Sequence, residues 1–141
     1  WIRALSPFRM DVAREHRKLP LSSPEGMVDL QEPGHWVVES ADGARVWSAS
    51  LPNQPRGETA FWLQALQSRL AGEFAVAEPG TVGGFSTLRL VSRDDKPYVW
   101  VIGVRVVGRR LHLVEQFYPS RAHEARHEAA VRAVLSGGGD A

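Results

Sequence analysis

The 141-residue sequence has no cysteine, which excludes disulfide bonds and thiol chemistry and leaves the compartment open. It also lacks any apolar run that approaches the length of a membrane-spanning helix. Charge of one sign is not in excess, because the formal net charge is +1 at pH 7. Composition therefore gives no electrostatic reason to expect nucleic acid as a partner, and we predict none.

The 43% of hydrophobic and 23% of charged residues are ordinary for one globular domain of this length. We predict an N-terminal arm or linker at 1–26, a single domain at 27–136 and a flexible tail at 137–141. The chain begins at Trp1 and not at methionine, so we expect that a signal peptide, lipoprotein leader or membrane anchor was removed. A bias toward arginine over lysine, with much alanine, valine and glycine, indicates a bacterial source with a G+C-rich genome.

The longest apolar stretch predicts a β-hairpin with strands at 99–107 and 110–117, joined by a turn at Gly108-Arg109. Glycine at the first turn position suits a two-residue type II′ turn, because only glycine takes a positive φ without strain. Pairing across this turn gives one face that is apolar except for Glu115 and a second face of mixed character. We expect the apolar face in the core and the mixed face only partly covered.

Turn residues and apolar alternation predict further strands at 27–30, 35–39, 44–51, 74–77 and 85–91. A turn is expected at Pro79-Gly80. One helix is predicted at 58–71, ended by Gly72, and another at 121–135, with Ser120 as its N-cap. Small residues would let the second helix sit close on the sheet: Ala122, Ala129, Ala130, Ala133 and Val134. This order predicts an α+β fold, an antiparallel sheet of about six strands with two main helices packed on it.

The mixed face of the hairpin is where we expect binding. Its candidate residues are Val101, Gly103, Arg105, His112 and Val114. The two valines and the glycine leave a half-apolar surface that the two basic residues flank. With the arginines of the turn, this side of the hairpin could receive an acidic partner, or it could be a solvated outer sheet face.

Glu115 is the one charged residue on the apolar face of the hairpin. A carboxylate there needs a partner, because burying an uncompensated charge is costly. Arg89 is one candidate partner. The alternative is that Glu115 lies near the rim of the sheet and reaches water.

His123, Glu124 and His127 form an H-E-x-x-H pattern on the last predicted helix. Two histidines at i and i+4 can hold Zn²⁺ while the glutamate acts as general base on a bound water. Three features stand against a zinc-dependent hydrolase: only Asp140 follows as a third ligand, Arg126 puts a positive charge between the histidines, and the motif begins a terminal helix. The alternative is an exposed helix start in which Glu124 favours the positive end of the helix dipole.

Between residues 36 and 135 the layout resembles the PsbP-like fold, a group that includes bacterial DcrB-type lipoproteins and the effector-associated chaperones of type VI secretion. The resemblance rests on Gly34-His35-Trp36, on residues 59–63, on Gly83-Gly84-Phe85, on the long hairpin and on the terminal helix. It implies a non-enzymatic binding or assembly module, exported or tethered. In the chaperones of this group, the sheet face opposite the helices holds a partner's hydrophobic segment, which corresponds here to the mixed face.

We therefore predict a bacterial partner-binding or assembly module without catalysis and without a cofactor, located on the periplasmic side of the cell envelope. Its partner would be a protein or a hydrophobic peptide segment. Zinc-dependent hydrolysis by the H-E-x-x-H helix is the alternative function. A third hypothesis makes the domain an inert tethered spacer.

Overall fold

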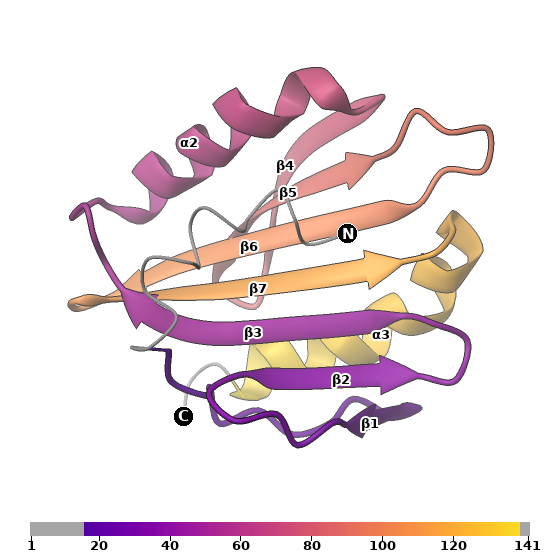
Figure 1. Cartoon of the computed structure of the whole chain (residues 1–141), viewed down its shortest axis with the longest axis horizontal. Coiled ribbons are helices and arrows are strands. Elements are labelled where there is room, and N and C mark those ends of the chain that lie inside the picture. The colour runs from indigo at the N-terminus through magenta and orange to yellow at the C-terminus, as the bar shows by residue number, and fades with distance from the viewer. Residues whose placement is uncertain (1–15, 139–141) are drawn as a thin grey trace.

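The computed structural model describes residues 16–138, which form seven strands and two α-helices. The strands make one antiparallel sheet in the order β1-β2-β3-β7-β6-β5-β4 (Figure 1). In chain order the elements are β1 Met27–Asp29, β2 Trp36–Ser40, β3 Arg45–Pro52, α2 Thr59–Leu70, the 3-10 turn η3 Ala71–Glu73, β4 Val76–Val82, β5 Phe85–Val91, β6 Val99–Val107, β7 Arg110–Tyr118 and α3 Arg121–Gly138. The predicted α+β fold is confirmed, with seven strands in place of about six.

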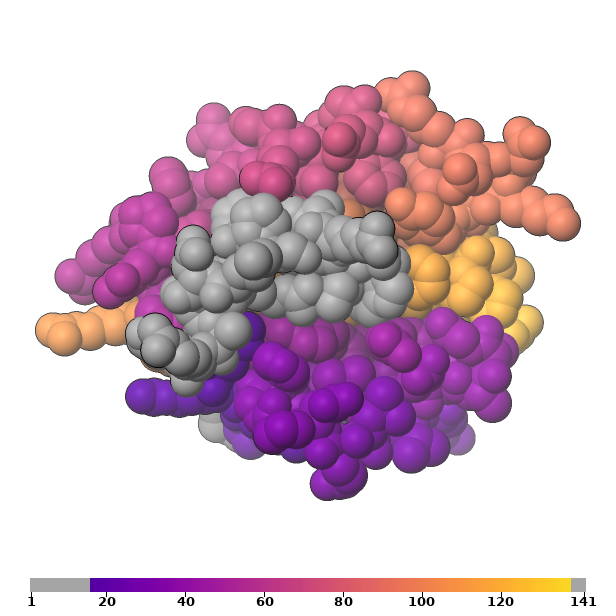
Figure 2. Space-filling view, in the orientation of Figure 1, coloured from indigo at the N-terminus to yellow at the C-terminus, as the bar shows by residue number. Residues whose placement is uncertain are grey.

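The β6–β7 hairpin lies near the middle of the sheet and has the predicted register. Val107 pairs with Arg110 beside the turn, and Trp100 pairs with Phe117 toward the other end. Gly108 has a φ of +60°, a conformation that glycine adopts without strain. The tip of this hairpin projects from the body of the molecule, at the left of Figure 2.

Each face of the sheet carries one helix. α2 packs on β5 and β6 through Trp62, Leu66 and Leu70, on the face that contains Trp100. α3 lies on the other face, behind the sheet in Figure 1, where Val101 is buried. We call these the α2 face and the α3 face.

The mixed face of the hairpin is the α3 face, so the expectation that this face lies opposite both helices is wrong. The sheet offers buried valines on both sides, and α3 has an apolar stripe that must also be buried. Placing one helix on each face covers both sets of apolar side chains.

The stripe by which α3 contacts the sheet differs from the predicted one. His127, Val131 and Leu135 are buried at intervals of four residues. Ala122, Ala129 and Ala133 are exposed. The larger apolar side chains decide the orientation of the helix, because burying them removes more apolar surface from water than burying alanine does.

Two local predictions from glycine and proline are also wrong. β4 continues through Pro79 and Gly80, and the turn lies at Gly83-Gly84, where both residues have positive φ. β4 is the last strand of the sheet, a position where proline is tolerated because its missing N–H can face away from the partner strand. Gly72 does not cap α2 but lies within the 3-10 turn η3.

The described part of the predicted arm packs against the domain. Arg17 exchanges two backbone hydrogen bonds with Ser50 of β3, at 2.9 and 2.8 Å. Leu19 is buried with Met27 in the core of the α3 face. The predictions for residues 1–15 and 139–141 lie outside the described residues.

Candidate functional site

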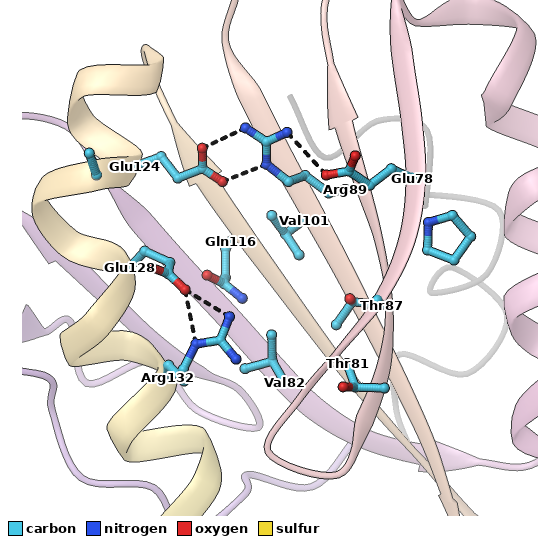
Figure 3. A pocket seen from close by; sticks show the side chains of 13 residues that line it. Glu78, Thr81, Val82, Thr87, Arg89, Val101, Gln116, Glu124, Glu128 and Arg132 are labelled. Atoms are coloured by element: carbon cyan, nitrogen blue, oxygen red, sulfur yellow. Dashed lines mark hydrogen bonds and ion pairs between the residues drawn. The ribbon is translucent and has the colours of Figure 1, made fainter.

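A groove of about 380 Å³ opens on the α3 face between the edge strand β4 and the helix α3 (Figure 3). β4 forms one wall, α3 forms the other, and β5, β6 and β7 supply the floor. The lining residues are Glu78, Pro79, Gly80, Thr81, Val82, Thr87, Arg89, Val101, Gln116, Glu124, Ala125, Glu128 and Arg132.

Two glycines of β4 and its turn shape the groove. A Cβ on Gly80 would come within 3.2 Å of the hydroxyl oxygen of Thr87. The absence of a side chain at Gly80 therefore leaves space beside this hydroxyl in the groove. A Cβ on Gly83 would come within 2.7 Å of the backbone of Leu135 and Ser136. The β4–β5 turn therefore packs directly against the C-terminal part of α3 and brings the two walls together there.

A chain of charged side chains crosses the groove at Arg89 (Figure 3). The guanidinium of Arg89 donates from Nε and Nη2 to the two carboxylate oxygens of Glu124, both at 2.7 Å. Its Nη1 lies 3.5 Å from an oxygen of Glu78. The carboxylate of Glu124 raises the pKa of Arg89, and Glu78 adds to this effect. This bidentate pair ties α3 to β5.

The floor of the groove holds a buried amide. The hydroxyl of Tyr118 donates to Oε1 of Gln116 at 2.6 Å, which leaves the amide Nε2 as the free donor. Gln116 is only 3% exposed, and its Nε2 has no hydrogen-bond partner among residues 16–138. Burial raises the pKa of Tyr118, and the carboxylates of Glu124 and Glu128 raise it further while Arg132 lowers it.

A second polar contact holds the N-terminal half of α3. Nε2 of His127 lies 2.8 and 3.0 Å from the two carboxylate oxygens of Asp42, in the β2–β3 turn. Ser40 and Arg126 also donate to this carboxylate. The hydrogen bond from Ser40, followed by those from His127 and Arg126, lowers the pKa of Asp42 well below its usual range.

The H-E-x-x-H side chains make three separate contacts. His123 lies 2.6 Å from the hydroxyl of Ser120, which also caps the helix as predicted. Glu124 is held by Arg89, and His127 contacts Asp42. Within residues 16–138, no three His, Asp or Glu side chains come together in a way that could hold a metal ion.

Of the five predicted binding residues, Val101 lines the groove. Val114 is fully buried in the core of the α3 face, and a Cβ on Gly103 would come within 2.7 Å of its side chain. The guanidinium of Arg105 lies over the ring of Phe85, 4.9 Å from its centre. Burial lowers the pKa of His112, and the charges of Arg105 and Arg110 lower it further. Gly103, Arg105, His112 and Val114 lie outside the lining of the groove.

Sequence reasoning missed most of the groove. Gln116 could have been found, because the predicted register pairs it with Val101 on the mixed face. Glu124, Glu128 and Arg132 follow one another at four-residue spacing, which predicts that they share one side of the helix. The wall at 78–82 was hidden by the turn expected at Pro79-Gly80.

Both expectations for Glu115 are wrong. The residue is 0% exposed and so does not reach water at the rim. Arg89 pairs with Val101 and therefore lies on the α3 face, on the other side of the sheet from Glu115. One carboxylate oxygen of Glu115 accepts a hydrogen bond of 3.1 Å from the indole N–H of Trp100.

A scan against protein-family models and a search of curated proteins found no match to this chain. No helix in the described part of the chain combines the length and apolar character that crossing a bilayer needs.

Proposed function

We propose that the chain is a bacterial partner-binding domain without catalytic activity, and that the groove between β4 and α3 receives an extended segment of another protein. The groove carries this proposal. Its volume of about 380 Å³ is near the lower end of the range of about 300–1,000 Å³ that is common for ligand sites. That size suits one or two residues of an extended chain. A tethered or exported location follows from the PsbP-like resemblance and belongs to the same proposal.

The chemistry of the lining favours binding over catalysis. Both oxygens of Glu124 accept hydrogen bonds from Arg89, so this carboxylate holds a guanidinium group and does not join His123 and His127 in a metal site. His127 is likewise engaged by Asp42. These contacts tie α3 to the sheet, and Glu124 of the H-E-x-x-H motif lines one wall of the groove.

The lining also changes the kind of segment that we propose. Val114 of the predicted apolar surface lies beneath other side chains, at 0% exposure. The lining of the groove presents the amide of Gln116 and two threonine hydroxyl groups beside Val82 and Val101. A segment with both polar and apolar groups therefore fits the groove better than a purely hydrophobic one.

The test is a selection of displayed random peptides against the full chain. Ala125 lines the groove, and Ala129 is exposed one turn further along α3 and does not line it. A peptide supports the proposal if Ala125→Trp, which fills the groove, abolishes its binding while Ala129→Trp retains it. Equal thermal stability of the two variants shows that both remain folded. If every selected peptide binds both variants equally, the groove is not the binding site and the proposal is wrong.

A further inference from the structure

We propose that the groove selects its segment through a lysine or arginine side chain, with a neighbouring backbone carbonyl of the segment accepting a hydrogen bond from Gln116. This preference rests on the proposed function, because it names the chemistry of the segment that the same groove would receive. Two independent features carry it: the charge of the lining and the unpartnered amide on the floor.

The lining has more acid than base. Three carboxylates, those of Glu78, Glu124 and Glu128, face two guanidinium groups, those of Arg89 and Arg132. The negative field reaches the floor, where Glu124 and Glu128 together raise the pKa of buried Tyr118 against the opposing effect of Arg132. A cation entering the groove therefore meets a net negative wall, and an anion is repelled.

Two carboxylate oxygens remain available on opposite walls. Arg132 donates from two nitrogens to a single oxygen of Glu128, at 2.9 and 2.8 Å, so the second oxygen has no partner in residues 16–138. Among the described residues, Arg89 alone reaches Glu78, at 3.5 Å, and the side chain of Glu78 is 61% exposed. An ammonium or guanidinium group has several N–H donors and can pair with either of these carboxylates.

The floor supplies the complementary group. Gln116 is nearly fully buried, and its amide Nε2 has no acceptor among the described residues. Figure 3 shows its side chain between Glu128 of the Glu128–Arg132 pair and Val101. Because Gln116 lines the groove and its Nε2 is the amide's open donor, a ligand can offer it an acceptor there. A backbone carbonyl provides one beside the cationic side chain.

The experiment titrates the ¹⁵N-labelled full chain with three blocked tripeptides, Ac-Ala-Lys-Ala-NH₂, Ac-Ala-Nle-Ala-NH₂ and Ac-Ala-Glu-Ala-NH₂. Norleucine keeps the length of lysine without its charge. We expect the lysine peptide to shift the backbone amide signals of the groove and the side-chain NH₂ signal of Gln116. The norleucine peptide should bind at least several-fold more weakly, and the glutamate peptide should not bind.

Charge variants test the same preference without changing the ligand. Glu78→Gln and Glu128→Gln should each weaken lysine-peptide binding by roughly twofold to fivefold, because each removes one partly exposed ion pair. Glu32→Gln, on an exposed residue outside the groove lining, should leave binding unchanged.

The outcomes separate the ligand preference from the function. Equal binding of the lysine and norleucine peptides, unaffected by the glutamate variants, overturns the cation preference and leaves the groove as a binding site. If none of the three tripeptides binds while the peptide library yields groove-dependent peptides, the preference for a cationic side chain is wrong. If no groove-dependent peptide emerges there either, both proposals fall.

Discussion

The two faces of the sheet hold their helices by different means. On the α2 face, Trp62, Leu66 and Leu70 enter a continuous apolar core with the side chains of β5 and β6. On the α3 face, Val131 and Leu135 are fully buried and Val134 packs against the same core, whereas the N-terminal half of the helix is held by polar contacts. A helix seated on apolar side chains is drawn close to its sheet, whereas ion pairs can hold a helix while leaving space beside it. The groove lies on the face held by polar contacts.

Truncating one buried leucine on each face tests this difference in packing most directly. Leu66→Ala should lower the free energy of unfolding by about 3–5 kcal/mol, because α2 lies against a packed core that cannot collapse into the cavity. Leu135→Ala should cost about 2–3 kcal/mol, because α3 buries fewer apolar side chains around it than α2 buries around Leu66. Chemical denaturation measures both values. Equal losses would show that the two faces are packed alike.

A pair of glycines tests the close contact between the β4–β5 turn and α3. Gly83 and Gly108 have similar positive φ values, +54° and +60°, so alanine strains both by about 1 kcal/mol. Only at Gly83 would the new Cβ meet backbone, at 2.7 Å; nothing lies within 4 Å of it at Gly108. Gly83→Ala should therefore cost about 2–3 kcal/mol and Gly108→Ala about 1 kcal/mol. Similar melting temperatures for the two variants would contradict a tight contact with α3.

The ion pair across the groove should contribute more than a surface pair. Arg89→Met leaves Glu124, whose side chain is only 16% exposed, without its bidentate partner. We expect a loss of about 1–2 kcal/mol, discounted for the exposure of Arg89. Arg132→Met removes the exposed pair with Glu128 on the same helix and should cost under about 0.5 kcal/mol. If the two variants unfold at the same denaturant concentration, polar contacts do not anchor α3.

Local sequence features predicted the β6–β7 hairpin fully. The position of Gly108 fixes which residues pair, and alternation then assigns each side chain to a face. β4 was missed because Pro79-Gly80 is a turn signal locally, and only the position of the strand at the sheet edge makes it acceptable there. The distribution of the helices on two faces depends on the fold as a whole, which no local pattern encodes.

The groove was beyond sequence reasoning for a similar reason. Its central contact joins Arg89 and Glu124, which are 35 residues apart and belong to a strand and a helix. The H-E-x-x-H motif suggested Glu124 as a general base. The motif gives no information about the guanidinium group of Arg89, which comes from β5. Glu115, on the other face, was mispredicted for the same reason. The strand register places Trp100 near Glu115, but this indole could be identified as the partner only once the burial of Glu115 was known.

The weakest expected effect concerns pH and the contact between Asp42 and α3. The folded-state pKa of Asp42 lies below the unfolded value of about 3.9, so its stabilising effect is complete above that pH and is lost as the pH falls through the folded pKa. The stability of the natural chain should therefore fall more steeply between about pH 4 and pH 2 than that of Asp42→Asn. Asp95→Asn, in the exposed turn between β5 and β6, serves as the control and should keep the natural slope. Denaturation curves across this pH range measure the difference. Parallel curves for the natural chain and Asp42→Asn would mean that this carboxylate does not hold α3. Arg89 would then be the polar contact that holds the helix, and denaturant unfolding of Arg89→Met measures its contribution.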